Sequence, residues 1–167
     1  MVLKIDHQTL LDRVAANYPV IAHELLRPLL DLFSVSRELC GGDADKFLVM
    51  LVVANRTTEH KLFASYSQSQ LLSGEVPVFP GLGTNVRSIA ESIGAPRETV
   101  RRKVTELIAA GWIARQGTDL YFTATAYQHL APARVAIEQL AVRNFAVVAE
   151  LLRQVDDTRS SHRNKRR

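Results

Sequence analysis

The chain of 167 residues has little of several features that mark specialised classes of protein. It contains one cysteine, Cys40, so an internal disulfide is impossible and a disulfide-stapled secreted fold is excluded. Its longest unbroken apolar run, Phe47 to Ala54, has eight residues, which is too short to span a bilayer. The first residues, Met1 to His7, show no basic region followed by an apolar stretch, so we expect no signal peptide. These absences predict a soluble, cytoplasmic protein without a membrane partner.

Residue groupings that would carry catalysis or hold a metal are also missing. The five histidines do not pair at metal-ligand spacing, and Cys40 has no cysteine neighbour. The glycines of Gly81-Leu82-Gly83 follow a Pro-rich loop and not a strand, so they are not a dinucleotide fingerprint. We therefore expect no enzyme, no metal and no cofactor, and we interpret Cys40 as an incidental thiol, with a redox sensor as the alternative.

The net charge is small as well, because 21 Lys and Arg residues are set against 17 Asp and Glu residues, giving +4. Its distribution is uneven. Segments 84–115 and 153–167 carry +3 and +4, whereas segment 1–83 carries −2 and segment 116–152 carries −1. Such an asymmetry indicates a polyanionic partner, and the alternative interpretation is a solvated face with a floppy tail.

An apolar fraction of 47% is ordinary for a globular protein, and the first part of the chain is predicted to be helical. Tyr18-Pro19 marks a boundary after a first apolar pattern. The next pattern, Val20 to Leu39, contains Pro28, which predicts either one kinked helix or two helices. Gly41-Gly42 ends this pattern.

A third helix is predicted from Ala44 to about Leu62, with Asp43 as a suitable N-cap. Its dense apolar run fits a helix buried in a core or between subunits, and a buried strand is the rival interpretation. The segment Ser73 to Gly83 has two prolines and three glycines in eleven residues, which predicts a loop.

Two short helices joined by a glycine-containing turn are predicted after this loop. Thr84 is a suitable N-cap for the first helix, and Gly94 permits the left-handed conformation of a sharp turn. Pro96 opens the second helix at its first position, and Gly111 is suited to end it. The first helix places its apolar residues at the spacing i, i+3, i+4, i+7: Val86, Ile89, Ala90 and Ile93. Two helices joined in this way are typical of the DNA-binding helix-turn-helix.

The second helix has a polar, basic face opposite its apolar stripe of Val100, Val104 and Leu107. Guanidinium groups suit bidentate contacts to guanine, and a carboxylate can accept from cytosine. The predicted base contacts are therefore Arg97, Glu98, Arg102 and Thr105. The predicted backbone contacts are Thr84, Asn85, Arg87, Arg101 and Lys103. A solvated amphipathic helix with surface arginines is the alternative.

The stretch from Pro96 to Arg102 resembles the recognition helix of the cyclic-AMP receptor (catabolite activator) family. That family reads bases with an Arg-Glu pair at the helix start and an Arg four residues after the Glu, which Arg97, Glu98 and Arg102 match. The resemblance covers Val86 to about Ile113 and implies DNA recognition. A cyclic-nucleotide domain is not implied, because no Gly-rich jelly-roll sequence precedes these helices.

One residue departs from the usual helix-turn-helix pattern. Lys103 stands three residues after Val100, where such helices usually carry an apolar side chain. Either Val104 takes this place, or Lys103 snorkels along its aliphatic stem. The rotation of the second helix about its axis, and with it the set of base contacts, depends on which alternative holds.

A β-hairpin is predicted from Trp112 to Thr123, where two short apolar runs flank a polar turn with a glycine. A hairpin directly after a recognition helix is a wing. The residues predicted to reach phosphate or the minor groove are Arg115, Gln116 and Thr118 of the hairpin and its tip. The alternative is a hairpin that only packs against the helices.

A long C-terminal helix is predicted from Ala131-Pro132 to Val155, with apolar residues at coiled-coil-like spacing. It packs either on the N-terminal helices of its own chain or on a second subunit. The order of helices, helix-turn-helix, wing and long C-terminal helix is similar to the multiple-antibiotic-resistance regulator (MarR-like) family, which implies dimerisation through the terminal helices. The family's acidic-arginine pair in the wing is absent, and this wing is shorter.

The predicted fold is mainly α with a small β-hairpin wing, a winged helix-turn-helix with N- and C-terminal dimerisation helices. Its parts are an N-terminal helical dimerisation or effector part (1–72), the winged helix-turn-helix (84–124), a dimerisation helix (125–156) and a disordered basic tail (157–167). The tail either adds phosphate affinity or solubilises the chain.

The predicted function is a transcriptional regulator that binds double-stranded DNA sequence-specifically. We expect a homodimer on a pseudo-palindromic operator, because one helix-turn-helix makes too few contacts for tight specific binding. An unidentified small-molecule effector is a further possible partner. The alternative function is a winged-helix module that binds protein, without specific DNA binding.

Overall fold

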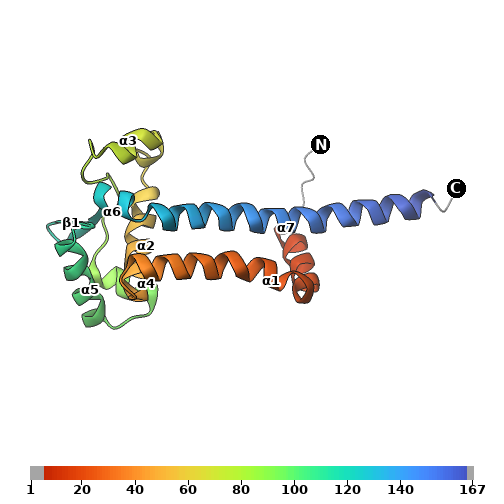
Figure 1. The fold of residues 1–167 in the computed structure, drawn as a ribbon, viewed down its shortest axis with the longest axis horizontal. Coiled ribbons are helices and arrows are strands. Elements are labelled where there is room, and N and C mark those ends of the chain that lie inside the picture. The colour runs from red at the N-terminus through yellow and green to blue at the C-terminus, as the bar shows by residue number, and fades with distance from the viewer. Residues whose placement is uncertain (1–5, 165–167) are drawn as a thin grey trace. The chain divides into compact units, whose positions relative to one another are not determined.

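The computed structural model describes residues 6–164 of the chain, with side chains through Arg153 (Figure 1). It is mainly helical, with one two-stranded antiparallel sheet. The chain divides into two compact units. The terminal unit comprises the residues up to Leu32 and those from Val135 onward, and the central unit comprises Phe33–Arg134. The predicted division separated residues 1–72 from residues 84–124. In the structure, the helix that begins at Ala44 and the short helices after it pack with the segment that follows position 84, so both belong to the central unit.

The terminal unit is built from most of two long helices, α1 (His7–Leu39) and α7 (Ala131–Asn164). α1 is one helix with both Pro19 and Pro28 inside it, so the predicted boundary at Tyr18-Pro19 is wrong. A proline inside a helix removes a hydrogen bond and bends the axis. Figure 1 shows the first, red part of α1 turned away from the orange part that follows.

α7 continues farther than the sequence predicts. The segment from 157 was predicted to be a disordered tail, but the helix runs through Asn164. The physical reason is that neither glycine nor proline follows Pro132, so nothing in the sequence terminates the helix. The remaining predicted tail, 165–167, lies outside the described residues.

Within the terminal unit, α1 and α7 are joined by Arg143, whose guanidinium lies 3.5 Å from the Asp31 carboxylate. Ile21 of α1 and Val147 of α7 are buried. A hollow of about 430 Å³ on this unit is lined by both charged and apolar side chains. Its lining consists of His23, Glu24, Arg27, Pro28, Arg143, Ala146, Val147 and Glu150.

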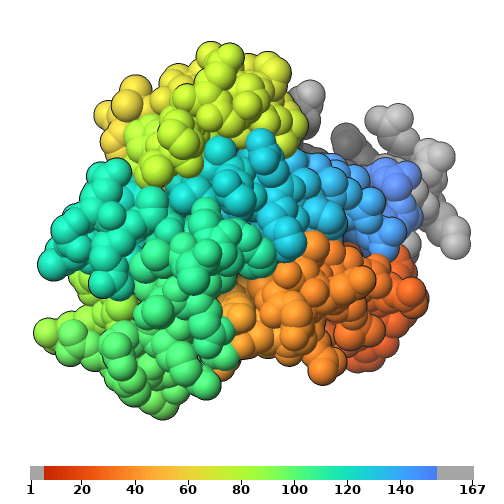
Figure 2. Space-filling view, turned by 60° about the vertical axis from the view of Figure 1, so that its left-hand side comes forward, coloured from red at the N-terminus to blue at the C-terminus, as the bar shows by residue number. Residues whose placement is uncertain are grey.

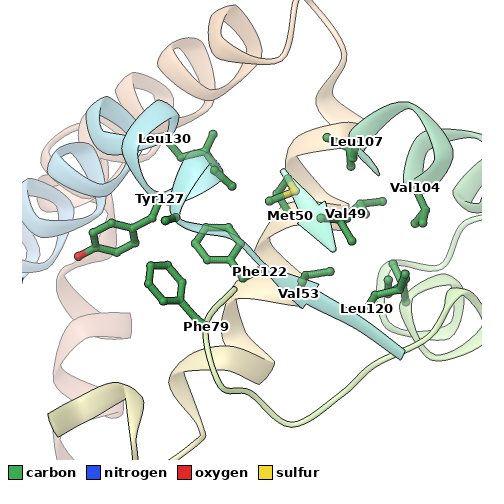
Figure 3. Packing of buried hydrophobic residues seen from close by; sticks show 14 of the residues in the cluster. Val49, Met50, Val53, Phe79, Val104, Leu107, Leu120, Phe122, Tyr127 and Leu130 are labelled. Atoms are coloured by element: carbon green, nitrogen blue, oxygen red, sulfur yellow. The ribbon is translucent and has the colours of Figure 1, made fainter. Parts of the chain in front are cut away.

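The core of the central unit is organised around α2 (Ala44–Thr58). The Asp43 carboxylate accepts a hydrogen bond from the backbone N–H of Lys46, so the predicted N-cap is confirmed. The dense apolar run is helical, and not a strand, and the helix ends at Thr58 rather than near Leu62. Figure 3 shows its Val49, Met50 and Val53 lying among side chains of the later helices and the hairpin.

Short elements follow α2. They are the 3₁₀ helix η1 (Phe63–Ser65), α3 (Gln68–Ser73), α4 (Val86–Ile93), α5 (Arg97–Ala109), β1 (Ile113–Gln116), β2 (Asp119–Phe122) and α6 (Ala124–His129). The predicted loop from Ser73 to Gly83 is confirmed except at Ser73, which ends α3, because no helix or strand element occurs between Gly74 and Asn85. It is nevertheless anchored, because Phe79 is buried and the centroid of its ring lies 5.6 Å from that of Tyr127. Figure 3 shows these two rings next to each other.

Candidate nucleic-acid interface

The start of α4 differs by one residue from the prediction. Asn85, not Thr84, is the N-cap, and its side-chain oxygen accepts a hydrogen bond from the Ser88 N–H over 3.0 Å. Thr84 is buried, and its carbonyl accepts a 2.8 Å hydrogen bond from the N–H of Leu120 in β2. Thr84 therefore joins the loop to the hairpin, and its buried side chain does not fit the predicted contact with a DNA backbone.

A tight turn connects α4 to α5. Gly94 adopts a left-handed conformation with φ 66°, and its N–H and that of Ala95 both donate to the Ala90 carbonyl. An L-residue with a side chain would be strained at this φ, which explains the glycine. Pro96, predicted as the first residue of the second helix, is instead the N-cap of α5, which begins one residue later at Arg97. The turn holds the two helices against each other through the buried residues Ile89 and Ala90 of α4.

The C-terminus of α5 is fixed by a Schellman motif. The Trp112 N–H donates to the Leu107 carbonyl over 2.9 Å, and the Gly111 N–H donates to the Ile108 carbonyl over 2.9 Å. Gly111 has φ 74°, as the predicted helix end requires. The chain passes directly from this motif into β1, so the hairpin begins at a defined point on α5.

α5 has one buried and one exposed face. Val100, Val104 and Leu107 are at most 1% exposed, so the predicted inward stripe is confirmed. The exposed polar and charged residues of α5 are Arg97, Glu98, Arg101, Arg102 and Thr105. In Figure 2 this helix, in green, and the blue-green hairpin beside it form part of the visible surface of the central unit. The outer face of α5 thus presents three guanidinium groups, one carboxylate and one hydroxyl.

Two of these side chains form an ion pair with each other. Arg101 donates to the Glu98 carboxylate through Nε over 2.9 Å and through Nη2 over 2.6 Å. These hydrogen bonds, together with the positive charge, lower the pKa of Glu98, so the carboxylate stays ionised at neutral pH. Thr105 donates its hydroxyl hydrogen to the Arg101 carbonyl over 2.9 Å. Within the described part of the chain, neither Arg97 nor Arg102 forms a side-chain hydrogen bond or ion pair of this kind.

Lys103 does not lie on the exposed face. Its side chain is 12% exposed, and its ammonium is paired with the Asp43 carboxylate of the turn before α2. The predicted phosphate contact by Lys103 therefore does not fit the geometry, since α5 is rotated so that this residue faces α2. Val104 takes the inward position, with no exposed surface. Nothing in the local sequence marks Asp43 as the partner, because 60 residues separate the two.

The hairpin has a two-residue tip. Gln116 pairs with Asp119, so Gly117 and Thr118 form the turn, and only the first of them has a positive φ, 62°. This pattern is that of a type II′ turn, whose twist matches that of the strands. Arg115, Gln116 and Thr118 are exposed, whereas Leu120 and Phe122 of β2 are buried. The hairpin is thus both a packing element and an exposed surface.

Arg87 is the remaining predicted contact residue. It is exposed on α4, and its Nε donates to the Glu91 carboxylate over 2.9 Å. A hollow of about 440 Å³ lies beside it, where α4 turns into α5. Its lining consists of Arg87, Ala90, Glu91, Gly94, Ala95 and Arg97. The structure therefore brings Arg87 and Arg97 to one concave surface.

Among the described residues, no group of three or more His, Cys, Asp or Glu side chains could hold a metal ion. None of the helices within residues 6–164 has the length and apolarity needed to cross a membrane. In comparisons with family models, curated proteins and solved structures, no match was found.

Proposed function

We propose that this protein is a sequence-specific, double-stranded DNA-binding regulator of transcription, with a winged helix-turn-helix formed by α4, α5 and the hairpin. The observation that carries this proposal is the exposed face of α5, which is rich in Arg and lies opposite a fully buried stripe. Such a helix fits the major groove, with its N-terminal half at the base edges. Here that half contains Arg97, Glu98 and Arg102.

The side chains of this face divide into two proposed roles. Arg97 and Arg102 have the donors for bidentate contacts to guanine, and Glu98 can accept from the amino group of cytosine. Arg101 and Arg87 suit phosphate, because their guanidinium groups can exchange a surface carboxylate for a phosphate oxygen. The exposed hairpin residues Arg115, Gln116 and Thr118 are proposed to contact the backbone or the minor groove, and Thr105 a thymine methyl or phosphate.

We further propose that the chain acts as a homodimer. α1 has exposed apolar side chains at the spacing i, i+3, i+4, i+7: Leu26, Leu29, Leu30 and Phe33, which are between 39% and 62% exposed. An apolar stripe at helical spacing is normally covered, so its exposure on a single chain supports a partner. A second copy is the simplest partner, because a two-fold protein can read both halves of a palindromic site.

Selection from a random pool of duplex DNA tests the main proposal. We expect enrichment of an inverted repeat, with the spacing of its halves set by one or more helical turns. The affinity of the enriched duplex should fall steeply as salt rises, because phosphate contacts release counterions. If no sequence is enriched and salt has no effect, the DNA-binding proposal is wrong, and the alternative of a protein-binding module is favoured.

Sedimentation tests the homodimer separately. Leu29→Asp together with Leu30→Asp should convert the dimer to a monomer, because charges are costly in an apolar interface. Val20→Asp, which adds one such charge, is the control, since Val20 is 74% exposed on α1 but lies outside the stripe. A wild-type chain that sediments as a monomer at micromolar concentration would show that the homodimer is wrong.

A further inference from the structure

Two ion pairs connect the beginning of α2 to the side of α5 that faces it. The Lys103 ammonium is paired with the Asp43 carboxylate, and the Lys46 ammonium lies 2.8 Å from the Glu106 carboxylate. Asp43 has two roles, because it also caps α2 by accepting the backbone N–H of Lys46. Each pair thus joins a fixed point on α2 to a point on the middle of α5.

The signs of these charges alternate. Asp43 and Lys46 are three residues apart on one side, and Lys103 and Glu106 are three residues apart on the other. In the observed register each negative group meets a positive one. If α5 slid by one turn along α2, like charges would face each other, Lys46 against Lys103 or Asp43 against Glu106, and like charges in contact are unfavourable. The four residues therefore select one register and rotation of α5.

The pair between Lys103 and Asp43 is partly shielded from water, which strengthens it. The side chain of Lys103 is 12% exposed and that of Asp43 is 23% exposed, so water screens this pair less than a surface pair. Burial by itself raises the pKa of the Asp43 carboxyl, but the hydrogen bonds and charges of Lys103 and Lys46 outweigh burial and lower it. The carboxylate is therefore ionised at neutral pH, as the pairing with Lys103 requires.

We propose that Lys103, through its pair with Asp43, is a positioning residue for the DNA interface, which sets the rotation of α5 so that Arg97 and Arg102 point at the bases. This inference rests on the proposed function of α5. It differs from a phosphate contact by Lys103 in what it predicts for salt dependence. A phosphate contact contributes to the salt slope of both specific and non-specific binding, whereas a positioning residue changes only the alignment with the bases.

The experiment compares Lys103→Met with Lys61→Met, measured on the selected duplex and on a duplex of unrelated sequence. Lys103→Met keeps the aliphatic stem and removes the ammonium, and Lys61 is an exposed lysine of the central unit whose loss changes the net charge equally. We expect Lys103→Met to lower specific affinity about tenfold relative to Lys61→Met, roughly the effect of one misaligned base contact. Its non-specific affinity and salt slope should equal those of Lys61→Met.

Two results would overturn the proposal. Specific affinity equal to that of Lys61→Met would show that the pair does not position α5. If the salt slope of Lys103→Met is smaller by about one than that of Lys61→Met, and affinity falls equally for both duplexes, then Lys103 contacts phosphate directly.

A second variant serves if Lys103→Met does not fold. Asp43→Asn removes the carboxylate that pairs with Lys103 and keeps a side chain suited to cap α2, so the ratio of specific to non-specific affinity should fall several-fold. An unchanged ratio in folded Asp43→Asn would overturn the proposal. This change also removes a negative charge from the protein, which by itself raises affinity for both duplexes alike.

Hydrogen exchange separates this inference from the proposed function. If the wild-type protein binds no duplex, the proposed function fails, but the amides of α5 still report on the ion pairs. They should exchange faster in Lys103→Met than in Lys61→Met, because α5 loses its link to α2. Equal exchange in the two variants would overturn the structural part of the inference.

Discussion

The Thr123 hydroxyl donates a 2.7 Å hydrogen bond to the Gly111 carbonyl, and so links the start of α6 to the residue that ends α5. The same oxygen accepts the Ala126 N–H over 3.2 Å, which makes Thr123 the N-cap of α6. Thr123 is buried, so water cannot replace these partners without rearrangement. The Thr123 side chain therefore ties the residue after the hairpin to the residues just before it.

Thr123→Val should destabilise the fold. The substitution keeps the shape but removes the cap of α6 and leaves the Gly111 carbonyl without its hydroxyl donor, so we expect a loss of about 1–3 kcal/mol. Urea denaturation measures the free energy of unfolding. Thr58→Val is the control, because Thr58 is exposed and donates only to the Asn55 carbonyl of its own helix. Equal effects of the two changes would contradict the role of Thr123.

Gly83→Ala should also be destabilising, for a steric reason. A Cβ at this position would lie 2.7 Å from Cγ of Asp119 and 2.9 Å from its Cβ, closer than such atoms approach. The loop or β2 must shift, and we expect a cost of about 1–3 kcal/mol. The thermal midpoint measures it, and Asp119→Gly in the same chain should recover most of the loss. Without that recovery, the clash is not the cause.

Arg102 and Arg101 should behave differently on DNA. Arg102→Ala is expected to cost about 1–3 kcal/mol on the selected duplex and to relax the preference at one position of the half-site. Arg101→Ala should weaken binding to all sequences similarly and reduce the salt slope by about one. Titrations of both duplexes at several salt concentrations separate these patterns. Identical profiles for the two variants would contradict the assignment of base and phosphate roles.

Acid should remove the contribution of the pair between Asp43 and Lys103 to the stability of the fold. The pKa of Asp43 is lowered in the folded chain, so the unfolded chain takes up this proton first as the pH falls. The stabilisation is therefore fully present above the ordinary pKa of Asp, about 4, and is lost as the pH falls through the lowered value. Unfolding of wild type and Lys103→Met at pH 7, 5 and 3 should show a difference that shrinks only at the lowest pH.

Cys40 should react slowly with thiol reagents in the native protein. It is 5% exposed, and burial, helped by the negative charge of Asp43, raises the pKa of its thiol. A raised pKa lowers the fraction of thiolate, which is the reactive species, and burial keeps the reagent away from the sulfur. Labelling with an alkylating reagent should be much faster in denaturant than in native buffer. Equal rates would indicate an accessible thiol and would reopen a redox role.

The local features of the fold are predictable from sequence. Gly94 and Gly111 mark real left-handed turns, and Asp43 is a real N-cap, because each of these signals depends on only a few neighbouring residues. The hairpin between Trp112 and Thr123 is predictable for the same reason. What periodicity could not decide was the packing partner of α2, which buries its apolar run against α5 and the hairpin.

The candidate site is less predictable, because side-chain partners come from distant parts of the chain. The basic face of α5 follows from helical geometry, so its exposed residues were identifiable. The burial of Thr84 follows from its hydrogen bond to Leu120, and the position of Lys103 follows from Asp43. Both depend on contacts between residues far apart in the sequence, which a helical wheel cannot predict.

The anchored loop between α3 and α4 has a practical consequence for engineering. Its second half is tied down, because the Phe79 N–H donates to the Phe122 carbonyl and Gly81 lies against Thr57. Its first residues, Gly74 and Glu75, are exposed. A peptide tag or a second domain should therefore be accepted between Gly74 and Glu75 and rejected a few residues later. A single segment without regular structure thus contains both a permissive and a forbidden insertion point.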